Sequence, residues 1–360
     1  MSKIIPGISN LGKVPLCKGF MAEKESIARL VDDIDQHPAS LAWRQIDGGK
    51  SIVQEIDVLK QQEKSSVYRL RGRTPSRWTV IAKRCLSETG QLEEVVYEKI
   101  LPSLSVSALR YYGCLNANGS DIWLFLEDAG TRRFSIANES HRILAAHWLG
   151  TLQRSAQHIK AAQIMPERGP AYYLELMQKG RKCIAKSLTN PVMRRADLDL
   201  LQKLLRLMDA LESDWPKLLK ICQAIPQTLA HGDFQPRNIH VKQEPTGAAL
   251  YVMDWEMAGW GVPLVDIAPS RGFSMDVQVD LSIYLSIVQE FWLNLDMSTL
   301  KYYVHVGSIF RRLAAIYWSS LGLSYRWIEE PIQSIDIYYK ELEHAIVGVF
   351  GKEFANGGRA

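Results

Sequence analysis

The chain has 360 residues, of which 47% are hydrophobic and 23% are charged. That composition is typical of a globular protein with a substantial core, and it excludes a chain that is mainly disordered. The net charge of +4 comes from 43 basic and 39 acidic side chains, and no basic run is dense enough to predict a nucleic-acid partner.

Cysteine usage and hydropathy bear on where the protein works. The five cysteines are scattered and lack CxxC spacing, so they predict neither a disulfide framework nor a zinc site. No segment approaches the roughly 20 apolar residues of a membrane span, and residues 1–20 lack the apolar core of a signal peptide. We therefore expect a cytoplasmic protein with no membrane partner, either a monomer or a homodimer.

The predicted elements begin with a helix over residues 22–37. Its evidence is a set of apolar residues at i, i+3, i+4, i+7 spacing: Ile27, Leu30, Val31 and Ile34. We expect this helix to end at His37, because a residue that precedes a proline, here Pro38, is pushed out of the α region.

Residues 51–127 have the pattern of an antiparallel sheet. Short segments rich in β-branched and aromatic residues alternate with Gly, Pro and Asn, at 51–59, 65–72, 77–85, 108–115 and 121–127. One predicted helix, residues 91–104, interrupts them, and Pro102 marks its end.

From residue 138 onward the pattern is mainly helical. Predicted helices cover 138–159, 197–215, 276–295, 298–323 and 332–350. A short island of strands and turns intervenes at 228–268. The fold class is therefore α+β. We expect an N-terminal extension with a helix (1–50), a sheet lobe (51–128) and a larger helical lobe (129–360).

The strongest chemical signal is the segment HGDFQPRN at residues 231–238, followed by Asp254 at the end of the apolar strand LYVMD. Phosphoryl transfer needs a carboxylate that faces the acceptor hydroxyl and hard oxygen ligands for Mg²⁺. Asp233, Asn238 and Asp254 supply these parts. The alternative is that they are ordinary loop and N-cap residues.

HGDFQPRN and MDWE resemble the HGDxxxxN loop and the IDWE strand end of the aminoglycoside phosphotransferase and choline kinase family. The resemblance covers roughly residues 51–270 and implies a bilobal, protein-kinase-like fold. It implies that Asp233 is the catalytic base, that Asn238 and Asp254 bind metal, and that Asp266 supports the catalytic loop. The implied cofactors are Mg²⁺ and ATP or GTP.

Lys83 lies in TVIAKRC, a strand otherwise suited to burial, where a lysine needs an anionic partner. By resemblance it contacts nucleotide phosphates and a helix glutamate. Glu93 is our choice for that glutamate, because it precedes Tyr97 by four residues as in the family pattern. Glu94 and Glu98 are the alternatives.

Two further nucleotide contacts follow from the resemblance. The phosphate-covering turn in LKQQEKSSVYRL contains no glycine, so backbone amides and hydroxyls near Ser65 and Ser66 are the candidates, and a plain hairpin turn is the alternative. In LFLEDAG, backbone groups of Glu127, Asp128 and Ala129 are expected to bind the purine edge. A simple connection between the lobes is the alternative there.

The implied partner is a small-molecule hydroxyl acceptor. Aromatic and acidic side chains of the C-terminal helices suit a cationic acceptor: Trp292, Tyr302, Tyr303, Tyr317, Trp318, Tyr325, Trp327, Glu329, Glu330 and Asp336. For each of them, core packing or a solvated helix face is the alternative. We expect an antibiotic kinase of the aminoglycoside type. A choline, ethanolamine or sugar kinase and a nucleotide-binding pseudokinase scaffold are the other hypotheses.

Overall fold

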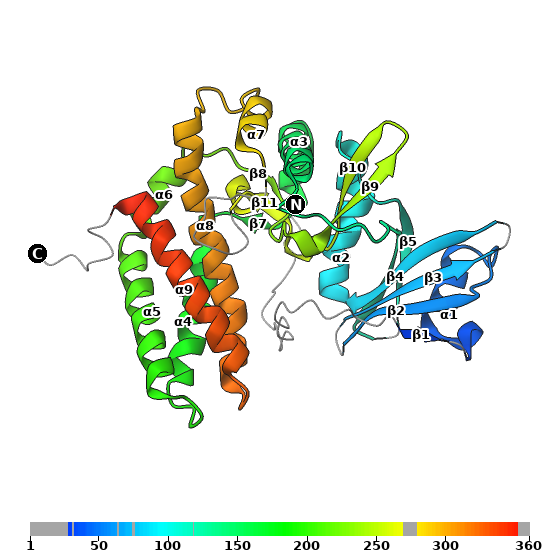
Figure 1. The fold of residues 1–360 in the computed structure, drawn as a ribbon, viewed down its shortest axis with the longest axis horizontal. Coiled ribbons are helices and arrows are strands. Elements are labelled where there is room, and N and C mark those ends of the chain that lie inside the picture. The colour runs from blue at the N-terminus through cyan, green and yellow to red at the C-terminus, as the bar shows by residue number, and fades with distance from the viewer. Residues whose placement is uncertain are drawn as a thin grey trace, which may run out of the picture.

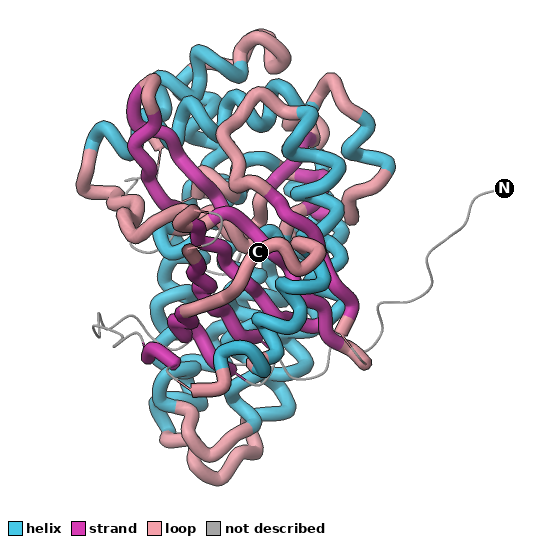
Figure 2. The backbone as a smooth tube through the Cα atoms, turned by 90° about the vertical axis from the view of Figure 1, so that its right-hand side faces the viewer, coloured by secondary structure: helices cyan, strands magenta, loops and turns pink. Residues whose placement is uncertain are grey.

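A computed structural model describes residues 28–30, 32–62, 65–73, 76–117, 119–268 and 279–351. A sheet-rich part lies at the right of Figure 1 and a helical part at the left. The sheet-rich part faces the viewer in Figure 2. Among the described residues, no helix is both long and apolar enough to cross a membrane.

The sheet-rich part is built on a six-stranded sheet in the order β1-β2-β3-β4-β6-β5, with every neighbouring pair antiparallel. The strands are β1 (Ala28–Leu30), β2 (Glu55–Gln62), β3 (Ser65–Gly72), β4 (Trp78–Leu86), β5 (Tyr111–Asn116) and β6 (Asp121–Glu127). The bounds of β3 and β6 coincide with those predicted from the sequence.

One helix packs on each face of this sheet. Helix α1 (Pro38–Ile46) places Trp43 in a cluster with Tyr68, Ala82 and Phe125 on one face. Helix α2 (Ser87–Val95), which continues as a π-helical segment (Val96–Ile100), lies on the other face. There Gly90 approaches Cys85 and Ile122 so closely that a Cβ would clash with Ile122 Cγ2 at 2.1 Å. Because side chains alternate along β4, Lys83 shares the α2 face with Cys85.

The helix predicted over residues 22–37 is wrong where it can be assessed. Residues Ala28–Leu30 form the edge strand β1, and only Ile34–Gln36 adopt a short 3₁₀ turn, while residues 22–27 and 31 lie outside the described part. His37 is extended as expected of a residue before proline, with ψ 135°, but it precedes α1 as its N-cap. Proline is well tolerated at the first position of a helix, so Pro38 begins a helix here.

The helical part contains α3 (Glu139–Ala156), α4 (Pro170–Ser187), α5 (Arg195–Ser213), α6 (Trp215–Cys222), α7 (Leu281–Val288), α8 (Met297–Ser320) and α9 (Glu329–Phe350). Five of these correspond to predicted helical segments, whereas α4 and all but the first residue of α6 lie outside them. The mixed α and β character agrees with the predicted fold class.

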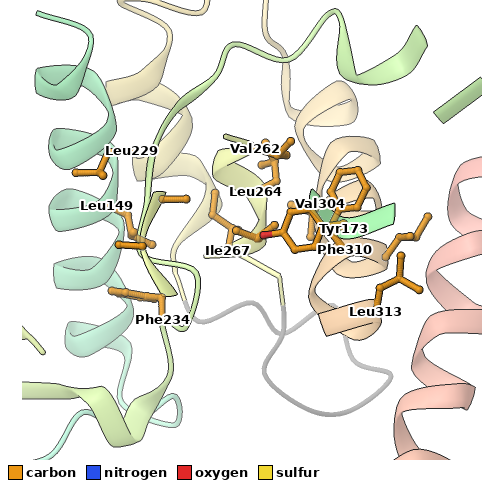
Figure 3. Packing of buried hydrophobic residues seen from close by; sticks show 14 of the residues in the cluster. Leu149, Tyr173, Leu229, Phe234, Val262, Leu264, Ile267, Val304, Phe310 and Leu313 are labelled. Carbon is orange, nitrogen blue, oxygen red and sulfur yellow. The ribbon is translucent and has the colours of Figure 1, made fainter. Parts of the chain in front are cut away.

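The predicted island of strands lies between the sheet-rich and helical parts (Figure 1). It consists of the antiparallel hairpin β9 (Ile239–Glu244) and β10 (Gly247–Val252), and of β8 (Thr228–Ala230) and β11 (Gly259–Gly261), which pair with β7 (Glu167–Arg168). Apolar side chains beneath it come from α3, α8 and the chain after β11, as Figure 3 shows for Leu149, Phe310 and Leu264. This core fixes the loop that precedes β9.

Candidate active site

The β9–β10 hairpin brings together Asn238 and Asp254, which lie in two separate sequence motifs. Ile239 pairs with Val252 at the open end of the hairpin, and the Met253 N–H donates to the Asn238 carbonyl at 3.0 Å. Asn238, just before β9, therefore lies beside the chain that leads to Asp254, just after β10. Antiparallel pairing explains how the spacing in sequence becomes proximity in space.

Asp233 is held by side chains of its own loop. Its Oδ2 accepts from Asn238 Nδ2 at 2.9 Å and from Arg237 Nη2 at 2.8 Å, and Gln235 Nε2 donates to Oδ1. Asn238 Nδ2 also donates to the Asp233 carbonyl at 3.0 Å. Because these bonds use the amide nitrogen of Asn238, its Oδ1 is the atom suited to a cation.

Lys83 joins the sheet to the loop after β10. Its Nζ lies 2.5 Å from Glu93 Oε1 and 2.5 Å from Asp254 Oδ1, and the lysine side chain is 12% exposed. Burial lowers the pKa of Lys83, but the charges of Asp254 and Glu93 outweigh it and raise that pKa well above its usual range. Lys83 is therefore a permanent cation between two carboxylates.

The pKa values of the two carboxylates are shifted in opposite directions. Burial raises the pKa of Glu93 to about 7 in spite of the neighbouring Lys83 charge. Burial also disfavours ionised Asp254, yet the charge and hydrogen bond of Lys83 lower its pKa to about 2. Asp254 is thus ionised at neutral pH and available to a divalent cation.

Of the three glutamates considered for Lys83, Glu93 is the one that contacts it, and it is fully buried. Glu94 instead accepts from Cys114 Sγ at 2.9 Å, and Glu98 is exposed.

Glu256 belongs to the site but was not singled out in the sequence. Carboxylate oxygens of Glu93, Asp254 and Glu256 lie within 4.8 Å of one another, close enough to hold a metal ion. Glu256 is the last residue of the MDWE motif, so the motif itself could have indicated it.

Two buried charged residues, Asp266 and Arg311, hold the backbone of the loop that carries Asp233. Asp266 accepts from the backbone N–H groups of His231 at 2.7 Å and Gly232 at 2.9 Å. Burial raises the pKa of Asp266 to about 6. Arg311 of α8 donates to the carbonyls of Val265 at 3.0 Å and Phe234 at 3.3 Å. Asp266 therefore supports the loop as expected from the sequence. Arg311 also supports it, which was not expected.

Gly232 is required by the backbone of this loop. Its φ is +78°, and an added Cβ would lie 2.4 Å from the Met257 carbonyl oxygen. A side chain at this position would therefore be strained and would also clash.

His231 bridges the loop and the strand end. Its Nδ1 lies 3.2 Å from the donating N–H of Asp233, and its Nε2 lies 3.1 Å from the Met253 carbonyl. Both bonds are satisfied by a neutral imidazole with its proton on Nε2. Burial lowers the pKa of His231 to about 4, so its imidazole is neutral at pH 7, and both ring nitrogens are occupied by these two bonds.

A pH dependence of stability follows from His231. Its pKa is about 4 when folded and about 6.5 when unfolded, so the unfolded chain binds the extra proton between these values. The free energy of unfolding should therefore fall as pH falls, by about 2 kcal/mol from pH 7.5 to pH 5 through this group. Denaturant unfolding of the wild type and of His231→Phe at both pH values isolates the contribution of His231 to this change. An equal loss in both proteins would refute the assignment.

Arg311 is expected to position the loop that carries Asp233. Arg311→Met should reduce turnover by roughly 10- to 100-fold, because small displacements of a reacting group are costly, while nucleotide affinity stays unchanged. The neighbouring pair Arg312–Glu341, with Nε and Oε2 2.6 Å apart, joins α8 to α9. Its joint replacement by Met and Leu, which leaves no unpaired buried charge, is the matched control. Equal turnover in the two variants would contradict this role of Arg311.

The residues expected to bind the purine edge are held by side-chain contacts. Glu127 forms an ion pair with Lys242 of β9, and Asp128 binds Arg69 of β3 at 2.7 Å. The Glu127 N–H donates to the Arg110 carbonyl at 2.8 Å, and Ala129 is buried. These contacts fix the connection after β6, and purine binding by its backbone stays a prediction.

The two serines of the glycine-free turn point in opposite directions. Ser65 pairs with Cys85 and so shares the face of Lys83, whereas Ser66 pairs with Arg84 on the other face. Ser66 is only 3% exposed. Of the two side chains, that of Ser65 is therefore on the face of the candidate site.

Comparison with known proteins places this arrangement in a family. A choline kinase from Cryptosporidium parvum Iowa II superimposes with a TM-score of 0.55 at 11% identity, covering 85% of this chain and 92% of that one. A spectinomycin phosphotransferase, solved with ADP and spectinomycin, gives 0.52 at 12% identity, covering 85% and 98%. An ethanolamine kinase from Plasmodium vivax gives 0.53 at 14%, covering 81% and 82%.

At these identities the likeness establishes the fold, which is the predicted protein-kinase-like one. No curated protein sequence matches the chain. The model of the phosphotransferase enzyme family, however, matches residues 68–289, well over half of the chain, including the Lys83 strand, the Asp233 loop and Asp254. The chain belongs to the phosphotransferase enzyme family and is a kinase of the small-molecule type.

Proposed function

We propose that this phosphotransferase moves the γ-phosphate of ATP or GTP onto a hydroxyl of a small molecule, with Asp233 as the catalytic base. The observation that carries the proposal is one cluster of contacts. Asn238 and Asp254 are linked through the β9–β10 hairpin, Asn238 binds Asp233, and Lys83 binds Asp254.

Asp233 is suited to orient an acceptor hydroxyl. Its carboxylate is fixed by Gln235, Arg237 and Asn238, and its side chain is 20% exposed. A fixed, accessible carboxylate can accept the proton of a hydroxyl as the new P–O bond forms. The structure thus supports general-base catalysis by Asp233.

The oxygen donors around Asp254 fit Mg²⁺, which prefers carboxylate and amide oxygens. Asn238 Oδ1 and the Asp254 carboxylate would hold the ion, and Glu256 would add a third oxygen donor. A bound Mg²⁺ would offset the negative charge of the nucleotide phosphates. Lys83 would contact the same phosphates, and Glu93 would keep its ammonium in place.

We expect residues outside this cluster to select the acceptor. Trp292 and Tyr317, two of the aromatics expected near a cationic acceptor, are 7% and 6% exposed and belong to the core. Tyr325 and Trp327 stack on each other with ring centroids 5.4 Å apart. Antibiotics of the aminoglycoside type remain our first acceptor class. Amino alcohols are the second, because similar folds include a choline kinase and an ethanolamine kinase.

Incubation with Mg²⁺, ATP or GTP and a panel of acceptors tests the proposal. The panel holds aminoglycosides, spectinomycin, choline, ethanolamine and nucleosides, and mass spectrometry detects the added phosphoryl group. We expect one acceptor class to gain that mass with the wild type and none to gain it with Asp233→Asn. Nucleotide binding without transfer to any acceptor would favour the pseudokinase hypothesis instead.

A further inference from the structure

The turn between β2 and β3 poses a question about phosphate binding. A glycine-rich turn lets backbone amides approach phosphate oxygens closely, but residues 59–70 contain no glycine. If this chain binds a nucleoside triphosphate beside Lys83, as the proposed function requires, another group should supply the missing contacts.

A β-bulge in β2 changes which side chains face the candidate site. Val58 pairs with Tyr68, but the next pair is Lys60 with Val67, so Leu59 is the extra residue. Without the bulge, Leu59 would stand opposite Val67 and Lys60 would point to the other face. Bulges commonly re-aim a side chain next to a functional site.

The bulge aligns Lys60 with Lys83. Lys60 pairs with Val67, and Val67 pairs with Lys83 across the next strand. Residues directly opposite one another in a sheet project from the same face. Lys60 therefore shares the face of Lys83, two strands away, which is about 10 Å between backbones.

The charge balance of this face favours an additional cation. Lys83 is already shared between Glu93 and Asp254, and Glu256 adds a third carboxylate to the cluster. Lys60, by contrast, is exposed. It lies on the same sheet face as Lys83, as the strand pairing shows. It is thus a cation near the candidate phosphate site that is not sequestered by burial.

We propose that Lys60, projecting from β2 on the same sheet face as Lys83, binds the terminal phosphates of the nucleotide in place of a glycine-rich turn. This inference rests on the proposed function. A lysine ammonium suits the task because it is a compact charge on a flexible stem that can follow phosphate oxygens.

Titration calorimetry of Lys60→Met with ATP, ADP and adenosine tests the inference. We expect ATP binding to weaken by about 10-fold or more, as for a lost charge-assisted hydrogen bond, ADP binding to weaken less, and adenosine binding to stay unchanged. Lys60→Arg should retain most of the ATP affinity because it keeps the charge. Lys99→Met removes an exposed lysine of the π-helical segment in the same lobe and should bind all three ligands like the wild type.

The possible failures are distinguishable. If wild-type protein binds no nucleotide, the proposed function fails and this inference with it. If the wild type binds ATP and Lys60→Met binds it equally well, only the inference is overturned. Equal weakening of adenosine and ATP would also overturn it, because the effect would then lie in the strand and not in the phosphates.

Discussion

Asp233→Asn is expected to reduce phosphoryl transfer by roughly 10²- to 10⁴-fold, the range that a positioned general base contributes. Asparagine keeps the size of the side chain but cannot accept a proton from the hydroxyl. The oxygen of the new asparagine can still accept from Asn238, and Lys83 keeps its ion pairs with Glu93 and Asp254. Affinity for the Mg²⁺–nucleotide complex should therefore change little. Steady-state turnover together with nucleotide titration separates the two quantities.

Asp209→Asn is the matched control for this experiment. Asp209 also forms an Asp–Arg pair, with Arg181 at 2.7 Å, but it is 62% exposed and lies in α5. Exposed pairs contribute little, so this variant should behave as the wild type. Full activity of Asp233→Asn, or an equal loss in both variants, would contradict the assignment of Asp233.

Asp254→Asn should raise the Mg²⁺ concentration needed for half-maximal activity by at least about 100-fold. Loss of a group that only supports a metal ligand typically costs 10- to 100-fold in affinity or activity, and we place Asp254 as a direct ligand. Asparagine is the suitable replacement because Asp254 has φ 69°, a left-handed conformation that Asn tolerates better than most residues.

A Mg²⁺ titration of turnover at fixed nucleotide concentration measures this effect. Lys83 keeps Glu93 as a partner in the variant, so the protein should remain folded, which thermal unfolding checks. An unchanged half-saturating Mg²⁺ concentration in folded protein would remove Asp254 from the metal site.

Strands β3 and β6 could be predicted from the sequence because local residue preferences favour strand at these positions. The segments that became β3 and β6 are rich in β-branched and aromatic residues and are bounded by turn residues. The helix over residues 22–37 could not be excluded in the same way. Its apolar spacing is short, and pairing of Ala28–Leu30 with β2 depends on a strand far along the chain.

The candidate site was predictable to the extent that it lies in compact motifs. Asp233, Asn238 and Asp254 occur in two short segments, and hairpin pairing brings those segments together. Arg311 and the alignment of Lys60 with Lys83 were not predictable. The first depends on how α8 packs beneath the loop, and the second depends on a one-residue bulge that reverses the side-chain alternation.

A crystal structure with Mg²⁺ and a non-hydrolysable ATP analogue is the most direct test of the account. We expect a metal ion about 2.0–2.1 Å from oxygens of Asn238 and Asp254, with the Lys83 ammonium against the phosphates and the Asp233 carboxylate facing the terminal one. A triphosphate bound elsewhere, or a metal ion that contacts neither Asn238 nor Asp254, would contradict it.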